Sequence, residues 1–394
     1  KTQDAKRKQD VLSTMAHFYF EAGDFPNAAS YSEKAAEGVG GDEQVDYLMR
    51  AAKLQGWMGD KAAAVKNYQK AMPLLPSTQK LDVEKELLNQ YEELKDASQV
   101  LSRSRALMSQ EPEEMKWVFL YGEALYQQGS RSDAMGVFEK VDEQFARKVA
   151  SAPATVTPEE RAFAAQARFY RAGQEMAAFK AISIKGDKIE NALIQQKLKA
   201  HQAVEAAGLE VAQYSSPRWT IASLMMAAEA NDEISRFFLE APEPKGLDTA
   251  QRQQYRQLVE DKVRPYREKA LQYRKAALEK AYHLGIFCPE VTACYATLNN
   301  GSRPPAIGRG SLNLRSGEGG AAQSPKELLE ALYADPGNPS LLESLAVSYA
   351  DQGEEDLAAL VLHRILEKNP QDPESQNLLG LLHLSKAEDQ EAYR

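Results

Sequence analysis

A set of small and turn-forming residues recurs every 34 positions near the C-terminal end of this chain. The matched pairs are Pro336 and Pro370, Ala346 and Gly380, Gly353 and Ala387, and Ala358 and Ala392. A fixed period of this length is typical of arrays in which each repeat is one small unit that buries its apolar face against the next unit. The period therefore predicts a stack of similar units rather than one compact core.

The residue types within one unit predict a helix, a turn and a second helix. Leu345, Ala346 and Tyr349 share one face of the first helix, Gly353 allows the turn, and Pro370 stops the second helix. Two helices pack closely where a small side chain meets a large one. A glycine accommodates a turn, and a proline cannot continue a helix. Each unit is therefore expected to be a helix pair.

The N-terminal third carries a looser version of the same pattern. Ala16, Gly23 and Ala28 reappear 36 positions later as Ala52, Gly59 and Ala64. A less regular third unit runs from about residue 81 to 108. A fourth shows five landmarks, namely Trp117, Gly122, Gly129, Ala134 and Phe138. We interpret residues 1–149 as about four helix pairs.

These landmarks resemble the tetratricopeptide repeat (TPR), whose pattern runs W-x2-L-G-x2-Y, then A-x3-F, then A and P. The resemblance implies an all-α, TPR-type helix-turn-helix solenoid in two blocks, separated by a helical middle region that does not follow the repeat. It also implies a protein-protein interaction scaffold, in which the first helices of the pairs form a concave face that takes an extended or helical segment of a protein partner.

The sequence as a whole predicts four regions. After the N-terminal solenoid (1–149), residues 150–298 read as long helices near 158–180, 187–214, 219–239 and 248–284, with a short one from Pro289. Pro265 is expected to kink or break the fourth of them. Residues 299–325 contain six glycines and read as a linker. Residues 326–394 are expected to form a separate body of acidic repeats.

The charge distribution excludes some partner classes. The formal charge is −9, and residues 324–394 account for it with 14 acidic and 5 basic residues. A protein that binds nucleic acid needs a basic surface, so no nucleic-acid partner is expected. No uninterrupted apolar stretch is long enough to span a membrane.

Catalytic and metal-binding patterns are missing from the sequence. The five histidines stand alone, without a cysteine or a second histidine at ligand spacing. No P-loop, H-E-x-x-H or G-x-S-x-G pattern occurs. We therefore expect no enzyme, no metal and no cofactor.

Counting from the landmarks predicts the partner-binding residues of the concave face. Aromatic side chains with an occasional charge are typical of anchored recognition, whereas the alternative is that Trp57 and Phe119 pack between neighbouring repeats. The candidates are His17, Phe20, Met49, Lys53, Trp57, Phe119, Glu123 and Tyr126.

Two further expectations concern the last repeat and the cysteines. Leu381 and Leu384 add apolar surface near the chain end and favour docking to a partner or to a second copy, unless that end is simply frayed. Cys288 and Cys294 could form a disulfide across a helix start, or could be two free thiols.

The middle region has a second resemblance. Trp219-Thr-Ile-Ala-Ser-Leu, the run from Phe237 to Leu247 and the segment around Tyr255 resemble deltaproteobacterial cell-envelope repeat proteins, including the TPR component of the myxobacterial gliding-motility machinery. This resemblance implies assembly rather than catalysis, and a periplasmic or envelope location. A processed N-terminus, suggested by Lys1, would agree with it, and a cytoplasmic location is the alternative.

The competing function is an adaptor or regulatory subunit that presents clients to an enzyme or a chaperone. Chaperone adaptors line their groove with a basic clamp for a peptide carboxylate. The corresponding positions here hold Ser13, His17, Met49, Lys53, Phe119 and Glu123. This composition favours the scaffold.

Overall fold

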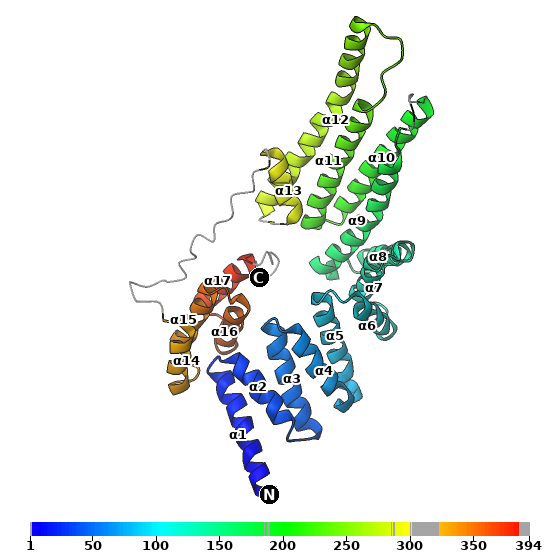
Figure 1. Ribbon diagram of the computed structural model, residues 1–394. Coiled ribbons are helices and arrows are strands. Elements are labelled where there is room, and N and C mark those ends of the chain that lie inside the picture. Colours follow the sequence, from blue (N-terminus) through cyan, green and yellow to red (C-terminus); the bar gives the residue numbers. More distant parts are fainter. Residues whose placement is uncertain are drawn as a thin grey trace. The chain divides into compact units, whose positions relative to one another are not determined.

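The computed structural model describes residues 2–184, 190–284, 288–299 and 323–385, together with residues 186, 286 and 301. Within these ranges the chain forms 17 α-helices and two short 3-10 helices, and no β-strand (Figure 1). The prediction of an all-α protein is confirmed.

Eight helices follow one another in the N-terminal region, as four consecutive pairs. They are α1 (Thr2–Glu21), α2 (Phe25–Ala36), α3 (Gly41–Trp57), α4 (Lys61–Ala71), α5 (Ser77–Glu93), α6 (Ala97–Gln110), α7 (Met115–Gln127) and α8 (Arg131–Ser151), with the 3-10 helices Met72–Leu74 and Pro153–Thr155 after α4 and α8.

The turn inside each pair repeats one local geometry. Gly23 has φ +73° and is followed by Asp24, whose side chain accepts a hydrogen bond from the backbone N of Asn27 and so caps α2. Asp60 caps α4 in the same way. A positive φ suits glycine because it has no Cβ, and an aspartate cap satisfies a free N–H at the helix start. In the less regular third pair, Lys95 takes this position with φ 56°.

The chain divides into two compact units, which we call unit 1 and unit 2. Unit 1 comprises residues 1–107 and 308–394, and unit 2 comprises residues 108–307. Unit 1 therefore combines both ends of the chain. Its C-terminal helices are α14 (Pro325–Ala334), α15 (Pro339–Asp351), α16 (Glu355–Lys368) and α17 (Pro373–Ser385).

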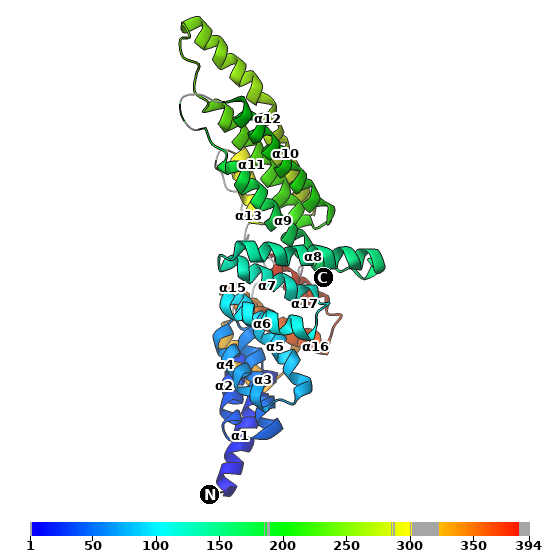
Figure 2. The same cartoon turned by 90° about the vertical axis from the view of Figure 1, so that its right-hand side faces the viewer.

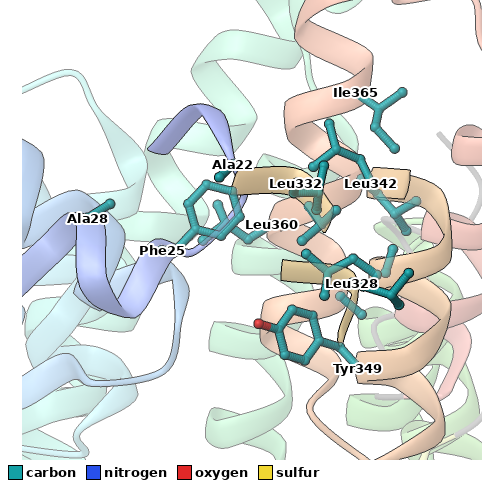
Figure 3. Packing of buried hydrophobic residues seen from close by; sticks show 14 of the residues in the cluster. Ala22, Phe25, Ala28, Leu328, Leu332, Leu342, Tyr349, Leu360 and Ile365 are labelled. Carbon is teal, nitrogen blue, oxygen red and sulfur yellow. The ribbon is translucent and has the colours of Figure 1, made fainter. Parts of the chain in front are cut away.

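Helices α14–α16 pack on the ends of α1 and α2 that meet at the Gly23 turn, and we call this contact the clasp. Its core joins Ala22 and Phe25 to Leu328, Leu342 and other apolar residues of the C-terminal helices (Figure 3). A Cβ on Gly23 would lie 3.0 Å from Cδ2 of Leu342, which shows how closely the two segments approach. The close packing of apolar side chains is the main stabilising contribution here.

Polar contacts surround the clasp core. Arg364 of α16 forms an ion pair with Glu21, and Lys368 Nζ lies 3.3 Å from Glu21 Oε2. Burial raises the pKa of Glu21, but the hydrogen bonds and charges of Lys368 and Arg364 outweigh that effect and lower it overall. The expectation that the C-terminal repeats form a separate body is wrong, because their apolar faces are completed by the first helix pair. The predicted region boundaries themselves stay predictions.

Unit 2 contains long helices beside one another. They are α9 (Pro158–Ala181), α10 (Asn191–Gln213), α11 (Pro217–Leu239), α12 (Thr249–Leu284) and the short α13 (Pro289–Leu298), which follow α7 and α8 (Figures 1 and 2). A core of buried residues from α9, α10 and α11, including Phe179, Val204 and Ile234, holds the first three together. Most of residues 299–325, the expected linker, lie outside the described ranges.

Of the two effects expected at Pro265, a kink or a break, the break does not occur. Helix α12 is continuous through this residue, so the lost N–H does not end the helix. Val263, two residues earlier, is buried, and Tyr266 packs against the core of α9–α11, so tertiary contacts hold both sides of the proline in place.

Candidate functional site

A hydrogen bond joins α1 and α3, the first helices of the first two pairs. The Tyr47 hydroxyl of α3 donates a hydrogen bond of 2.6 Å to Oγ of Ser13 on α1. His17 follows Ser13 by one helical turn and is exposed. This hydrogen bond joins α1 to α3, and His17 is an exposed residue of α1 near it in sequence.

An exposed stripe runs along α3. Asp46, Arg50, Lys53 and Trp57 are all exposed and are spaced four, three and four residues apart, which places them on one side of a helix. Trp57 is 54% exposed, although tryptophan is a largely buried residue type. We call these four residues together with His17 the α3 face. The predicted residues His17, Lys53 and Trp57 belong to it.

Two other candidates in unit 1 are engaged within the chain. Phe20 is partly buried against the clasp core, where its ring packs edge-to-face on Phe25 and the Arg364 guanidinium lies 5.0 Å from the ring centre. Met49 is partly buried against a cluster that includes Tyr47 and Leu48. Phe20 was assigned to the partner-binding surface, but it contacts the C-terminal repeats instead.

The candidates on α7 are covered by α9. Phe119 is 2% exposed and stacks on Phe163, with ring centres 5.0 Å apart. Glu123 accepts hydrogen bonds from the Tyr170 hydroxyl at 2.9 Å and from Gln166 at 3.1 Å. Burial raises the pKa of Glu123 more than these hydrogen bonds lower it. Phe119 therefore cannot contact a partner in this structure, and the prediction that it is a partner-binding residue is wrong.

Tyr126 is the third candidate residue on α7. Its ring lies 4.7 Å from that of Tyr170, and the Arg131 guanidinium lies 5.5 Å from its centre. It is partly buried. Helix α9 thus covers the side of α7 that is predicted to bind a partner, through Phe163 and Tyr170.

The cysteines are free thiols rather than a disulfide. Cys294 is fully buried, and its Sγ donates to the carbonyl oxygen of Arg274 at 3.0 Å. Burial and the neighbouring Glu290 raise the pKa of Cys288 to about 11. A thiol with a raised pKa is a weak nucleophile, so the pair contributes packing.

At the C-terminal end, Leu381 is partly buried and the side chain of Leu384 lies outside the described residues. The adjacent Leu382 is buried in the clasp core, with Leu378 and Leu379 packed against it. Part of the apolar surface of α17 is therefore already covered by unit 1.

The sequence patterns did not indicate a groove in unit 2. It has a volume of about 420 Å³ and is lined by residues of α9, α11, α12 and α13. Three methionines line it, Met176 from α9 and Met225 and Met226 from α11. The spacing of Met225 and Met226 fits a helix core equally well, so only the three-dimensional arrangement reveals the groove.

Two kinds of site were not found in the described ranges. No group of three or more histidine, cysteine or acidic side chains there could hold a metal ion. No helix in the same part of the chain combines the length and the apolar character needed to cross a membrane.

Comparison with known proteins gave structural neighbours only. No family model matches the chain. No curated protein matches it either. Similar solved structures include the C-terminal part of a TPR repeat-containing protein from Cytophaga hutchinsonii, with 13% identity over 92% of this chain and 98% of that one and a TM-score of 0.39.

Two other solved structures are also similar to this chain. A tetratricopeptide repeat protein from Parabacteroides merdae has 12% identity over 95% of this chain and 99% of that one, with a TM-score of 0.35. Yeast Tom70 has 11% identity over 89% of this chain and 90% of that one, with a TM-score of 0.28. The fold of this chain is all-α and of the TPR solenoid type, with paired helices joined by tight turns.

Proposed function

We propose that this chain is a non-enzymatic protein-protein interaction scaffold and that the α3 face binds a segment of a protein partner. The observation that carries this proposal is the exposure of Trp57 at the end of a stripe that also holds Arg50 and Lys53. Tryptophan and arginine are the residue types most enriched at the energetic centres of protein interfaces.

The charges of the α3 face define the partner segment. Arg50 and Lys53 lie toward the Trp57 end of α3, and Asp46 lies one turn before Arg50. An extended or helical segment with an apolar anchor for Trp57 and a carboxylate for Arg50 or Lys53 matches this order. Because these side chains are exposed, the contribution of each ion pair is about 0–1 kcal/mol, and the aromatic contact supplies most of the affinity.

The finer setting of this function is also proposed. The resemblance of residues 219–259 to envelope repeat proteins supports a place in a periplasmic or cell-envelope assembly, with gliding motility as the named example. An adaptor or regulatory subunit that presents clients is the alternative, and it uses the same face. Self-association through α17 remains part of the proposal, with Leu381 as its partly exposed contact.

Affinity purification from the native cells tests the proposal. Wild-type chain is compared with the double variant Lys53→Glu plus Trp57→Ala and with the control Lys66→Glu plus Lys70→Glu, which changes exposed residues of α4. We expect the first variant to lose a specific set of co-purifying proteins that the control retains. A partner set that is the same for all three would sink the proposal, provided that circular dichroism shows the variants to be folded.

A further inference from the structure

The clasp joins two parts of unit 1 that are far apart in the sequence and share one apolar core. Phe25 and Leu54 contribute to this core from α2 and α3, and Leu345 and Val361 contribute from α15 and α16, all of them buried. If α14–α16 left this position, both sides would expose contiguous apolar side chains, which is unfavourable in water. Each side therefore needs the other side, or an identical copy of it, as a cover.

Polar contacts at the edge of the core make the two sides specific for one another. Near the end of α16, Arg364 forms an ion pair with Glu21, and Lys368 Nζ lies 3.3 Å from the same carboxylate. At the start of α16, Asp356 lies so close to the turn after α3 that a Cβ on Gly59 would be 2.9 Å from its Oδ2. Contacts at both ends of α16 fix its direction across this surface. The surface thus fits the C-terminal helices of this chain in one orientation.

The connection between α13 and α14 does not determine which copy of the C-terminal helices occupies the surface. It comprises residues 299–324, and a stretch of 26 residues spans at most about 90 Å when fully extended. A length of this order allows α14–α17 to reach a second copy as well as their own chain. Exchange of an identical element between copies is a low-cost route to a dimer, because each copy makes the same contacts as before.

We propose that the clasp also forms between two copies of this chain, each of which gives its α14–α17 to the α1–α3 helices of the other. Within one chain the contact has an effective concentration on the order of 1 mM, so the closed single chain is favoured in dilute solution and the exchanged pair at higher concentration. The α3 face takes no part in this contact, so either proposal can fail without the other.

Charge reversal on the two sides of the clasp tests this proposal. Glu21→Arg and Arg364→Glu each place like charges together within a single chain, because residues 21 and 364 form the ion pair. In an exchanged pair with one chain of each kind, both contacts again join opposite charges. We expect each variant alone to keep the chain mass of 43.7 kDa in light scattering, and an equal mixture to give twice that mass. At roughly 0.1 mM, the two restored ion pairs outweigh the about tenfold advantage of the contact within one chain.

A zero-length crosslinker then identifies the contact in the mixed species. Carbodiimide couples an amine directly to a carboxylate, and Lys368 Nζ and Glu21 Oε2 lie 3.3 Å apart. The Glu21→Arg chain is labelled with 15N and has no carboxylate at position 21, so its Lys368 can be coupled only to Glu21 of the other chain. We expect a crosslinked peptide with one labelled and one unlabelled half.

The wild-type chain gives an independent readout. Its dimer fraction in sedimentation should rise with concentration and reach about half near 1 mM. Leu381→Glu is the control for the separate self-association proposed for α17. It should leave the mass of the mixed species and the crosslink unchanged.

Four results would overturn the proposal. They are a mixture that stays at the mass of one chain, a missing crosslink between labelled and unlabelled peptides, a wild-type chain that remains monomeric near 1 mM, and a dimer that Leu381→Glu abolishes. If Arg364→Glu fails to fold, since this side chain is only 9% exposed, Lys368→Glu takes its place, because Lys368 is exposed and faces the same carboxylate.

Discussion

The Tyr333 hydroxyl donates a hydrogen bond of 2.7 Å to Oδ2 of Asp24, across 309 positions of sequence. Asp24 also caps α2, so one carboxylate serves both the first helix pair and the clasp. Burial and the Asp24 charge raise the pKa of Tyr333 and keep it protonated as a donor. The two ends of the chain are thus joined by a specific polar contact beside an apolar core.

Replacing Tyr333 by phenylalanine removes this hydrogen bond and leaves the helix cap in place. We expect unit 1 to lose about 1–2 kcal/mol, because the acceptor is charged and Asp24 is 4% exposed. Hydrogen exchange should become faster in α1, α2 and α14–α16. Tyr282→Phe, at a tyrosine that is 53% exposed, is the control and should change neither. Equal exchange in wild type and Tyr333→Phe would contradict the role given to this contact.

Gly23→Val tests the close approach at the clasp. Valine there must adopt a positive φ and place its Cβ 3.0 Å from Leu342 Cδ2. Strain of the backbone alone costs roughly 1–2 kcal/mol, so the midpoint of urea unfolding for unit 1 should fall clearly. Gly40→Ala is the comparison, because Gly40 has φ −139° and no atom lies within 4 Å of the position that its Cβ would take. It loses only the preference for glycine at the N-cap of α3, so it should lower the midpoint far less. A wild-type midpoint for Gly23→Val would show that this turn is not held as described.

Lys197 is a buried lysine in unit 2, and its environment predicts a structural role. Its Nζ donates to the carbonyl oxygens of Phe179 and Ile182 at 2.9 Å and to Glu233 at 3.0 Å. Lys197→Met leaves two carbonyls and a carboxylate without their donor, so we expect a loss of roughly 2–4 kcal/mol. Thermal unfolding followed by circular dichroism measures it. Lys199→Met, an exposed neighbour on α10, is the control. Similar melting of both variants would argue against the buried ammonium as a determinant of stability.

His201 should make the stability of unit 2 depend on pH. Burial lowers its pKa below the ordinary 6.5, Glu205 opposes this shift, and Lys269 adds to it. Tyr266 and Phe179 cover the ring. The unfolded chain therefore binds a proton more readily, so stability is complete above about pH 6.5 and falls as the pH drops toward the lower, folded pKa. In His201→Gln this loss between pH 7 and 5 should disappear. An identical pH profile in that variant would assign the effect to other groups.

The local pattern predicted the helices well and their long-range contacts poorly. Residues 158–180 and 219–239 were expected as helices and form α9 and α11 within a few residues, because helix periodicity and proline starts are local properties. The clasp was not foreseen, since the apolar faces of Leu342 and Val361 look the same whether they meet a neighbouring repeat or the distant turn at Gly23.

The candidate site shows the same contrast between local pattern and long-range contacts. Trp57 and Lys53 are exposed, as a partner-binding role requires, because their exposure depends only on the register of α3, and that role itself stays a prediction. Phe119 was misplaced because α9 does not follow the repeat, yet its Phe163 and Tyr170 cover α7. The groove depends on α13 lying against α11, a contact that no spacing within either helix encodes.

Site-specific photo-crosslinking in the native cells tests the scaffold proposal most directly. A crosslinking amino acid is placed singly at positions 53 and 57 of the α3 face and, as controls, at positions 66 and 70 of α4. We expect a discrete crosslinked partner from positions 53 and 57 and none from the controls. If positions 53 and 57 give no product, or all four give the same products, the α3 face is not the partner-binding surface.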